Sequence, residues 1–371
     1  MKCYLDYNAS APVLKEVKEY IISLLDKVGN PSSIHTSGRH AKKILETARE
    51  EVSAMINAKK EDVIFTSGAT EANNLALNCF DKIISSNIEH DSIRLHKNID
   101  LIRVDNKGLY DLAELENKLQ SLDGKNKASI LVSAMYANNE TGIIQPIKEI
   151  AEIAKKYNVF FHTDAVQAVG RISVDMEYIG CDMITLSSHK IGGPMGAGAL
   201  VVRNKKILKS MIIGGSQEEN LRAGTESLLA LAGFGKAAKF CEQNLMSKVK
   251  NLRDKFEKIL IKYNPGIIIV GKNMDRLPNT FLFSVPGIKS ENLLIALDVE
   301  GFEVSSGAAC SSGQVEPSKT LKAMGFSSEI INSCIRVSLG HYNTIDEVIK
   351  FSETLKKINN RFLKIKNDIS R

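Results

Sequence analysis

Two kinds of segment alternate along the first two thirds of the 371-residue chain. Short apolar runs predict strands at 62–67, 83–90, 100–104, 129–138, 159–164, 183–190 and 199–203. Apolar residues at helical spacing predict helices at 41–56, 112–122, 147–157 and 228–261. Because most strands are apolar on both faces and alternate with helices, the pattern predicts an α/β domain with a largely parallel, fully covered sheet.

The pattern changes near residue 264. Short strands are expected at 266–271, 279–285, 303–310 and 333–340, with helices between them. A final helix is expected over 346–369, with Leu355, Ile358, Phe362 and Ile365 facing inward. The sequence therefore predicts a large domain over 16–260 and a smaller α+β domain over 261–371, preceded by an arm over 1–15.

Polar side chains lie at or just beyond the predicted strand ends of the large domain. They are Thr70, His90, Asn139, Asp164, Gln167, Ser187, His189 and Lys190. In parallel sheets of this kind, ligands bind at the carboxyl ends of the strands. We therefore expect these side chains to meet at one edge of the sheet.

Lys190 has the most distinctive surroundings in this set. Two serines and His189 precede it, and the glycine-rich run 191–200 follows it. Hydroxyl and imidazole groups can hold a phosphate, and glycine lets the backbone pass close to a ligand, so the amine could reach an aldehyde beside that phosphate. Pyridoxal phosphate carries both groups and is the cofactor that this arrangement predicts. The alternative is a lysine that only solvates a strand end.

Two other segments suit the same ligand. Residues 68–71 follow a strand and begin a helix, whose free amide hydrogens would hold a phosphate together with the Thr70 hydroxyl, unless the segment is an ordinary helix cap. Asp164 ends the strand before the one that carries Lys190. A buried carboxylate there can keep a pyridinium nitrogen protonated, although a turn aspartate would occur in the same context.

Composition restricts the class of protein. The net charge of +6 is spread along the chain without a basic block, which argues against a nucleic-acid-binding surface. No apolar run has the length of a signal peptide at the N-terminus or of a membrane span elsewhere, so we expect a cytoplasmic protein without membrane contact. The six cysteines lack C-x-x-C or metal-ligand spacing, which predicts reduced thiols and no resident metal.

Two residues of the smaller domain are candidates for a chemical role. Cys310 lies among Ser, Gly and Ala residues that cannot pack into a core, so its thiol is expected to be exposed on a loop that can reach a substrate; the alternative is a tight structural loop. The other five cysteines are expected to be buried as small hydrophobic residues. Arg336, inside an apolar strand, needs a carboxylate from the protein or from a substrate.

The motifs together resemble a known family. SGATE, NIEH, NNETG, TDAVQ, SSHK, RAGT, SSGAACSSG and IRVSLG follow one another as in the cysteine desulfurases, over essentially the whole chain. The segment VEPSKTL after Cys310 resembles the long-loop, NifS/IscS-like group. These proteins are class V aminotransferase-like, fold-type I pyridoxal-phosphate enzymes. The resemblance implies a mainly parallel seven-stranded sheet in the large domain and an N-terminal arm that joins the smaller one.

The resemblance also implies an activity. The protein would take sulfur from L-cysteine, leave L-alanine and hold the sulfur as a persulfide on Cys310. The sulfur would pass to an acceptor protein, either an iron–sulfur scaffold or a tRNA-thiolation enzyme. No direct nucleic-acid contact is implied, and Cys310 would hold an iron–sulfur cluster only transiently.

The resemblance assigns roles residue by residue. Lys190 would be the Schiff-base lysine, Asp164 the partner of the pyridinium nitrogen, and His90 the residue stacked on the ring and a proton carrier. Further cofactor contacts would come from Ala69, Thr70, Asn139, Gln167 (to the phenolic oxygen), Ser187 and His189, and from Thr225 of the second subunit of a homodimer. Asn139 and Arg336 would hold the substrate carboxylate.

Three features depart from the family pattern. Ser188 replaces a glycine before the His-Lys pair, which we expect to be tolerated. Glu219 replaces an arginine on a rim implicated in partner docking, and the chain ends at Arg371, without the longer tail that resembles a scaffold-docking segment. The last two leave the acceptor open. An aminotransferase, a selenocysteine lyase and a catalytically weak sulfur-carrier protein are the alternative functions.

Overall fold

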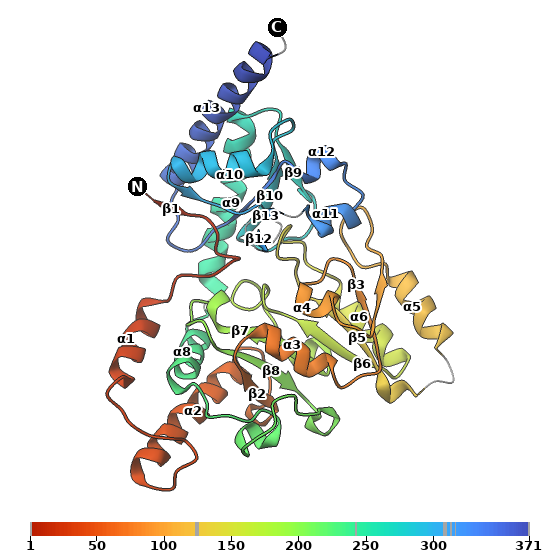
Figure 1. Ribbon diagram of the computed structural model, residues 1–371, viewed down its shortest axis with the longest axis vertical. Coiled ribbons are helices and arrows are strands. Elements are labelled where there is room, and N and C mark those ends of the chain that lie inside the picture. Colours follow the sequence, from red (N-terminus) through yellow and green to blue (C-terminus); the bar gives the residue numbers. More distant parts are fainter. Residues whose placement is uncertain are drawn as a thin grey trace.

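The computed structural model describes residues 2–122, 126–241, 243–306, 310–311, 314–315 and 317–369. Figure 1 shows a large sheet with helices around it and, beyond one edge of that sheet, a smaller unit from which the C-terminal helix extends. Among the described residues, no helix combines the length and the apolar character needed to cross a membrane.

The large sheet has seven strands in the order β2-β8-β7-β6-β5-β3-β4. Their bounds are Val63–Thr66 for β2, Lys82–Ser86 for β3, Ile99–Ile102 for β4, Ile130–Met135 for β5, Phe160–Asp164 for β6, Met183–Ser187 for β7 and Gly198–Val202 for β8. Strands β4, β3, β5, β6 and β7 are parallel, whereas β8 runs antiparallel to both β7 and β2. The prediction of a mainly parallel seven-stranded sheet is confirmed.

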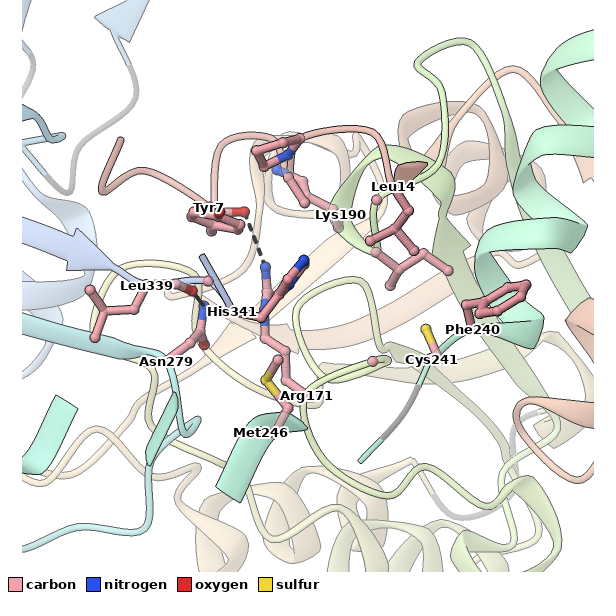
Figure 2. A pocket seen from close by; sticks show the side chains of 16 residues that line it. Tyr7, Leu14, Arg171, Lys190, Phe240, Cys241, Met246, Asn279, Leu339 and His341 are labelled. Atoms are coloured by element: carbon pink, nitrogen blue, oxygen red, sulfur yellow. Dashed lines mark hydrogen bonds between the residues drawn. The ribbon is translucent and has the colours of Figure 1, made fainter. Parts of the chain in front are cut away.

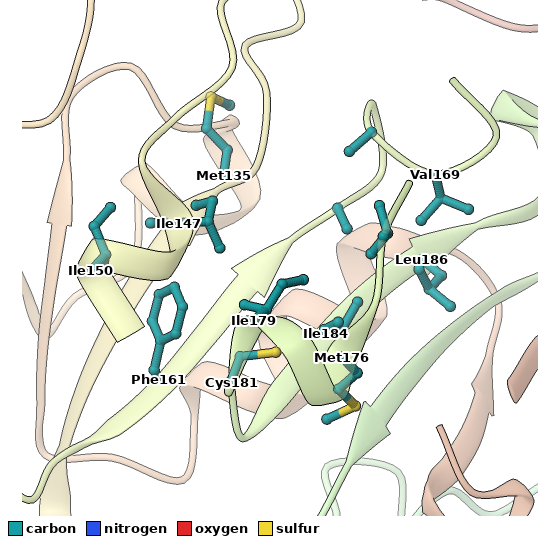
Figure 3. Close-up of a cluster of buried hydrophobic side chains, with 14 of the residues drawn as sticks. Met135, Ile147, Ile150, Phe161, Val169, Met176, Ile179, Cys181, Ile184 and Leu186 are labelled. Atoms are coloured by element: carbon teal, nitrogen blue, oxygen red, sulfur yellow. The ribbon is translucent and has the colours of Figure 1, made fainter. Parts of the chain in front are cut away.

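Helices cover both faces of this sheet because alternate residues of each strand face opposite sides. On one face, residues such as Phe65 and Phe161 pack with α2 (Thr36–Ala54), α5 (Leu112–Ser121), α6 (Ile147–Lys156), α7 (Met176–Ile179) and α8 (Leu228–Lys239). Figure 3 shows part of this cluster. On the other face, Ile64 and Leu131 pack with α3 (Ala69–Leu77) and α4 (Asp91–Arg94). Helix α1 (Lys15–Leu24) lies against α8.

The smaller unit is built on an antiparallel sheet of order β14-β10-β9. Its elements are α9 (Gln243–Tyr263), β9 (Ile268–Val270), β10 (Thr280–Ser284), α10 (Ser290–Val299), β11 (Phe302–Glu303), β12 (Cys310–Ser311), β13 (Gln314–Val315), α11 (Lys319–Ala323), α12 (Ser328–Ile331), β14 (Cys334–Ser338) and α13 (Ile345–Ile369). Phe256, Phe281, Phe283 and Phe351 form the centre of its core, with rings packed at tilted or edge angles.

The N-terminal arm joins this smaller unit. β1 (Cys3–Tyr4) pairs in parallel with β11. Cys3 and Leu5 are buried in the core of the smaller unit, which is called the second core below. A Cβ at position 340 would lie 1.9 Å from the Tyr7 ring, so only glycine allows the end of β14 to approach the arm this closely. The arm is therefore fixed by contacts with residues more than 290 positions later in the chain.

Several predicted elements differ in extent. The strand expected over 183–190 ends at Ser187, and of the strand expected over 303–310 only Glu303 belongs to β11. The single helix expected over 228–261 is two helices, α8 and α9, because Phe234 belongs to the first core and Phe256 to the second, and one straight helix would not reach both. The strand expected to end at His90 ends at Ser86. The domain boundary at residue 260 stays a prediction, although α9 already packs in the second core.

The final helix provides a test of the second core. Replacing Phe351 by Ala should lower the free energy of unfolding by about 3–5 kcal/mol, because the ring is fully buried against Phe256, Phe283 and Phe302. Leu363→Ala on the same helix should change it by less than about 0.5 kcal/mol, since Leu363 is exposed. Urea unfolding followed by circular dichroism measures both, and equal losses would contradict this description of the core.

Candidate active site

A cavity of about 800 Å³ opens at the carboxyl ends of the parallel strands. All eight side chains predicted from strand ends line it: Thr70, His90, Asn139, Asp164, Gln167, Ser187, His189 and Lys190. Ala69 and, from the smaller unit, Arg336 also line it. Thr225 is exposed on the loop before α8 and does not line this cavity. The side chain of Cys310 lies outside the described residues.

Lys190 follows β7 in a single 3-10 turn, Ser188–Lys190. Its Nζ donates to the backbone carbonyls of Asn8 at 2.6 Å and Ala9 at 2.8 Å. Burial, together with the positive charges of Arg171 and Arg336, lowers the pKa of Lys190 to about 8. An appreciable fraction of this amine is therefore neutral near neutral pH, as a nucleophilic or basic amine must be.

Asp164 is buried at the end of β6. Its Oδ1 accepts from the backbone N–H of Val166 at 3.0 Å, and its Oδ2 accepts from Asn73 Nδ2 at 2.8 Å. Asn73 also donates to Ser92. The carboxylate is thus held in place by two neutral donors, and no cation of the described residues is bonded to it, so it remains available to a positively charged ring nitrogen.

The N-terminus of α3 provides an anion cradle. Gly68 precedes the helix and supplies no side-chain cap, and the Glu71 carboxylate is occupied by Ser67 and Arg222 instead of the first amides. A Cβ at Gly198 of β8 would lie 2.6 Å from the Gly68 backbone, so glycine allows β8 to pass close behind this cradle. The exposed helix start suits a phosphate.

Three other predicted side chains differ in their surroundings. Gln167 is buried and donates from Nε2 to the Asn8 carbonyl at 3.1 Å. Burial and the charges of Lys190 and Arg171 lower the pKa of His189 to about 4, so its imidazole is neutral at pH 7. His90 is the exposed N-cap of α4, with Nδ1 2.9 Å from Ser92 Oγ.

Arg336 projects toward the cavity because of the alternation along β14. Its neighbours Ile335 and Val337 enter the second core, so Arg336 faces the opposite side. NH2 pairs with Asp6 at 2.6 Å and NH1 donates to the Asn139 carbonyl at 3.0 Å. Its buried Nε has no hydrogen-bond partner among the described residues. Of the two carboxylate sources predicted for it, the protein supplies one, and Nε remains for a second.

Several residues of the site were missed from the sequence. Asp6 and Asn8 belong to the N-terminal arm, whose position depends on pairing with the far end of the chain, so no local signal indicated them. Asn73 could have been found, because it lies one helical turn after Thr70 on the buried side of α3. Met195, Leu294 and Val304 add apolar walls to the cavity.

Ser188 and Glu219, the two substitutions that depart from the family pattern, are both accommodated by their neighbours. Ser188 is fully buried, and a Cβ at position 193 would lie 2.2 Å from its hydroxyl, so Gly193 provides the space for this serine. Glu219 is exposed, adopts a left-handed φ of 58° and pairs with Lys205 at 2.7 Å. The negative charge at this rim is thus partly neutralised by the protein itself.

The five described cysteines are free thiols. Cys3, Cys181 and Cys334 are buried as predicted, whereas Cys79 and Cys241 are only half-buried. Burial raises the pKa of Cys3, Cys241 and Cys334 to about 12, which makes these thiols poor nucleophiles.

The donor set fits pyridoxal phosphate. An uncapped helix start with nearby hydroxyls suits its phosphate, a buried carboxylate suits its ring nitrogen, and a partly neutral lysine suits its aldehyde. Fold and site thus define a pyridoxal-phosphate enzyme of the doubly covered α/β type. Comparison with known proteins agrees: the family described as Aminotransferase class-V matches residues 3–351.

Individual relatives show to which group of pyridoxal-phosphate enzymes the chain belongs. "Cysteine desulfurase IscS" of Dictyoglomus turgidum is 40% identical over 96% of this chain and 94% of that protein. "Cysteine desulfurase IscS 1" of Archaeoglobus fulgidus is 38% identical over 95% of each chain. The solved NifS-like protein from Rickettsia africae is 41% identical, with a TM-score of 0.90 over 97% of this chain and all of that one. The chain belongs to the cysteine desulfurases of the class-V aminotransferase family and depends on pyridoxal phosphate.

The environment of Lys190 predicts its reactivity. In the cofactor-free protein, acetylation of Lys190 should be half-maximal near pH 8, about two units below ordinary lysines, because its pKa is lowered to about 8. Competitive labelling between pH 6 and 11, with mass spectrometry of the Lys190 peptide, measures this midpoint, and surface lysines of the same sample serve as the control. A midpoint near pH 10 for Lys190 would overturn the interpretation.

Proposed function

We propose that the protein removes sulfur from L-cysteine and carries it as a persulfide on Cys310. The observation that carries the proposal is the meeting of Lys190, Asp164 and the uncapped start of α3 in one cavity. The relatives named cysteine desulfurase support cysteine as the substrate. The roles below are those that the geometry of this cavity favours.

Different residues of the cavity wall would hold different parts of the cofactor. When bound, pyridoxal phosphate supplies an aldehyde for amines and a ring that withdraws electrons from the substrate. The first amides of α3, with Ala69 and Thr70, would hold the phosphate together with Ser187 and His189. Asp164 would keep a proton on the ring nitrogen, Gln167 would donate to the phenolic oxygen, and His90 would contact the ring.

The substrate carboxylate is held at the junction with the smaller unit. Arg336 has a free Nε and an ion pair with Asp6 that an incoming carboxylate can replace. Asn139 is adjacent, because its carbonyl already accepts from Arg336. The amino group of cysteine would then face Lys190, which lines the same cavity.

The reaction balances without an external oxidant. Lys190 Nζ takes the α-proton of cysteine, and His90 takes the proton of the Cys310 thiol, because the thiolate is the nucleophilic form. The bond between Cβ and sulfur breaks while a sulfur–sulfur bond forms on Cys310, and the two protons held by Lys190 and His90 return to Cα and Cβ. Cysteine and one thiol thus give alanine and one persulfide.

The acceptor of this sulfur is, in our proposal, an iron–sulfur scaffold protein or a tRNA-thiolation enzyme. We also propose a cytoplasmic location. The five described free thiols support it, because reduced cysteines persist in a reducing compartment.

A turnover assay tests the activity. With L-cysteine and a reductant, the holoenzyme should release alanine and sulfide in equal amounts, and Cys310→Ala should lower turnover by more than about 100-fold while retaining bound cofactor, because the variant loses the proposed nucleophile. Cys79→Ala is the matched control and should stay within about twofold of wild type.

Other outcomes of that assay separate the alternatives. Amino-group exchange with a keto acid, without sulfide release, would replace the proposal by an aminotransferase. A strong preference for selenocysteine over cysteine would indicate the selenium lyase. Absence of any cofactor absorbance would favour a catalytically weak carrier.

A homodimer would complete the site. The loop before α8 exposes Ile213 to 91% together with Met211 and Ile212, and Met195 at the cavity wall is 70% exposed. Thr225 belongs to the same loop, which is closed by a hydrogen bond from the Ala223 amide to the Ile212 carbonyl. Apolar surface at a cavity mouth favours a second copy of the chain, which would bring Thr225 to the phosphate.

The oligomeric state checks this arrangement. Light scattering should give twice the mass of one chain for the wild type, whereas Ile213→Asp should shift the protein toward monomer and weaken cofactor retention, because a charge is placed in an apolar interface. Val299→Asp, at an exposed apolar position of α10, is the control and should remain dimeric. A wild-type monomer with fully bound cofactor would contradict the homodimer.

A further inference from the structure

Two cavities meet at Lys190. The larger is the active-site cavity, and the smaller, of about 70 Å³, lies behind it and is lined by Tyr7, Leu14, Arg171, Cys241 and His341 among others. Lys190 lines both, whereas Gln167 lines only the first and Arg171 only the second. Figure 2 shows Arg171 in the smaller cavity, reaching toward Tyr7. Arg171 thus lies on the side of Lys190 that faces away from the active-site cavity.

Arg171 is a buried cation without a carboxylate. It is 6% exposed, and among the described residues no acidic group lies within ion-pair distance of it. Its guanidinium donates only to neutral oxygens: NH1 to the Gln167 carbonyl at 2.7 Å and to Gln167 Oε1, and NH2 to the Tyr7 carbonyl at 3.2 Å. Burying an unpaired charge is unfavourable, so a use for the charge is expected.

The contact with Gln167 fixes the direction of that amide. A guanidinium has donors and no acceptor, so the oxygen of the amide must face Arg171. The Gln167 nitrogen then points the other way, where one of its hydrogens bonds the Asn8 carbonyl at 3.1 Å. The second hydrogen is left for a ligand of the active-site cavity, which Gln167 lines.

We propose that Arg171 is a positioning residue for two groups that touch the cofactor: it fixes Gln167 as a hydrogen-bond donor, and it places a positive charge behind Lys190. This inference rests on the proposed function, since it assumes that the active-site cavity holds pyridoxal phosphate. It adds a residue that touches neither cofactor nor substrate.

The charge at Arg171 acts on Lys190 together with other groups. Burial and the cations Arg171 and Arg336 lower the pKa of Lys190, whereas the carboxylates Asp6 and Asp164 raise it. His189, the adjacent residue, is neutral at pH 7 and contributes no charge. Removing Arg171 therefore leaves one cation against two carboxylates, and the pKa of Lys190 must rise.

Three substitutions separate the two effects. Arg171→Lys keeps the charge and a donor, Arg171→Gln keeps a donor without charge, and Arg171→Met removes both. Arg253→Met is the matched control, because Arg253 is also 6% exposed but belongs to the smaller unit, where it bonds Asp254 and the Leu277 carbonyl.

The first measurement is the pH midpoint of Lys190 acetylation in the cofactor-free protein. We expect it to rise by about one unit in the Gln and Met variants and to stay at the wild-type value in the Lys variant. The second is the equilibrium binding of pyridoxal phosphate, followed by absorbance. We expect binding about tenfold weaker in the Met variant only, because there the Gln167 amide is free to turn its oxygen toward the phenolic oxygen.

The outcomes are distinguishable. If Arg171→Met and Arg253→Met affect both measurements equally, Arg171 is only a structural residue and the inference is wrong. Should the Met variant fail to fold, the acetylation midpoints of the Lys and Gln variants test the inference. Equal midpoints in these two variants would overturn the charge effect. If the wild type does not bind pyridoxal phosphate, the proposed function fails, while the acetylation midpoints still test the charge effect.

Discussion

The backbone carbonyls of residues 7–9 hold the active site together. They accept from Arg171, Gln167 and Lys190, and Asp6 just before them pairs with Arg336. Because β1 is paired with β11 and Tyr7 lies against Gly340, these acceptors have a fixed position relative to the smaller unit. One short turn of the N-terminal arm therefore ties the cations of the large domain to the strand that carries Arg336.

The charges of the cavity follow from this arrangement. Neutral carbonyls can solvate a buried cation without cancelling its charge, so the charge of Arg171 disfavours the protonated form of Lys190, and burial with the charge of Arg336 lowers the pKa of Arg171 itself. An amine that must react with an aldehyde benefits from such repulsion. Asp164 is likewise fixed by neutral donors, which leaves its negative charge for a ligand.

The described residues on either side of the segment with Cys310 are held by the second core and by the cavity wall. β14 sends Ile335 and Val337 into the aromatic cluster, and its backbone bonds Ser305, just before the segment with Cys310. Beyond that segment, Ser318 and Thr320 donate to the buried Glu140, the neighbour of Asn139. The chain on both sides of Cys310 is thus fixed to residues next to the proposed carboxylate site.

The sequence determined the alternation of strands and helices, the mainly parallel seven-stranded sheet and the polar residues at its strand ends, because these features depend on local spacing and on the resemblance of short motifs. It also indicated Lys190, Asp164 and the start of α3 as one ligand site. Only the tertiary structure decided the parts that depend on distant pairing. Asp6 and Asn8 reach the site through contacts with residues beyond 270, helix 228–261 divides because two cores compete for it, and Arg171 lies behind Gln167 because of the turn after β6. The spacing of hydrophobic residues along the chain does not determine which backbone carbonyl accepts a hydrogen bond from a buried cation, because that contact joins distant segments.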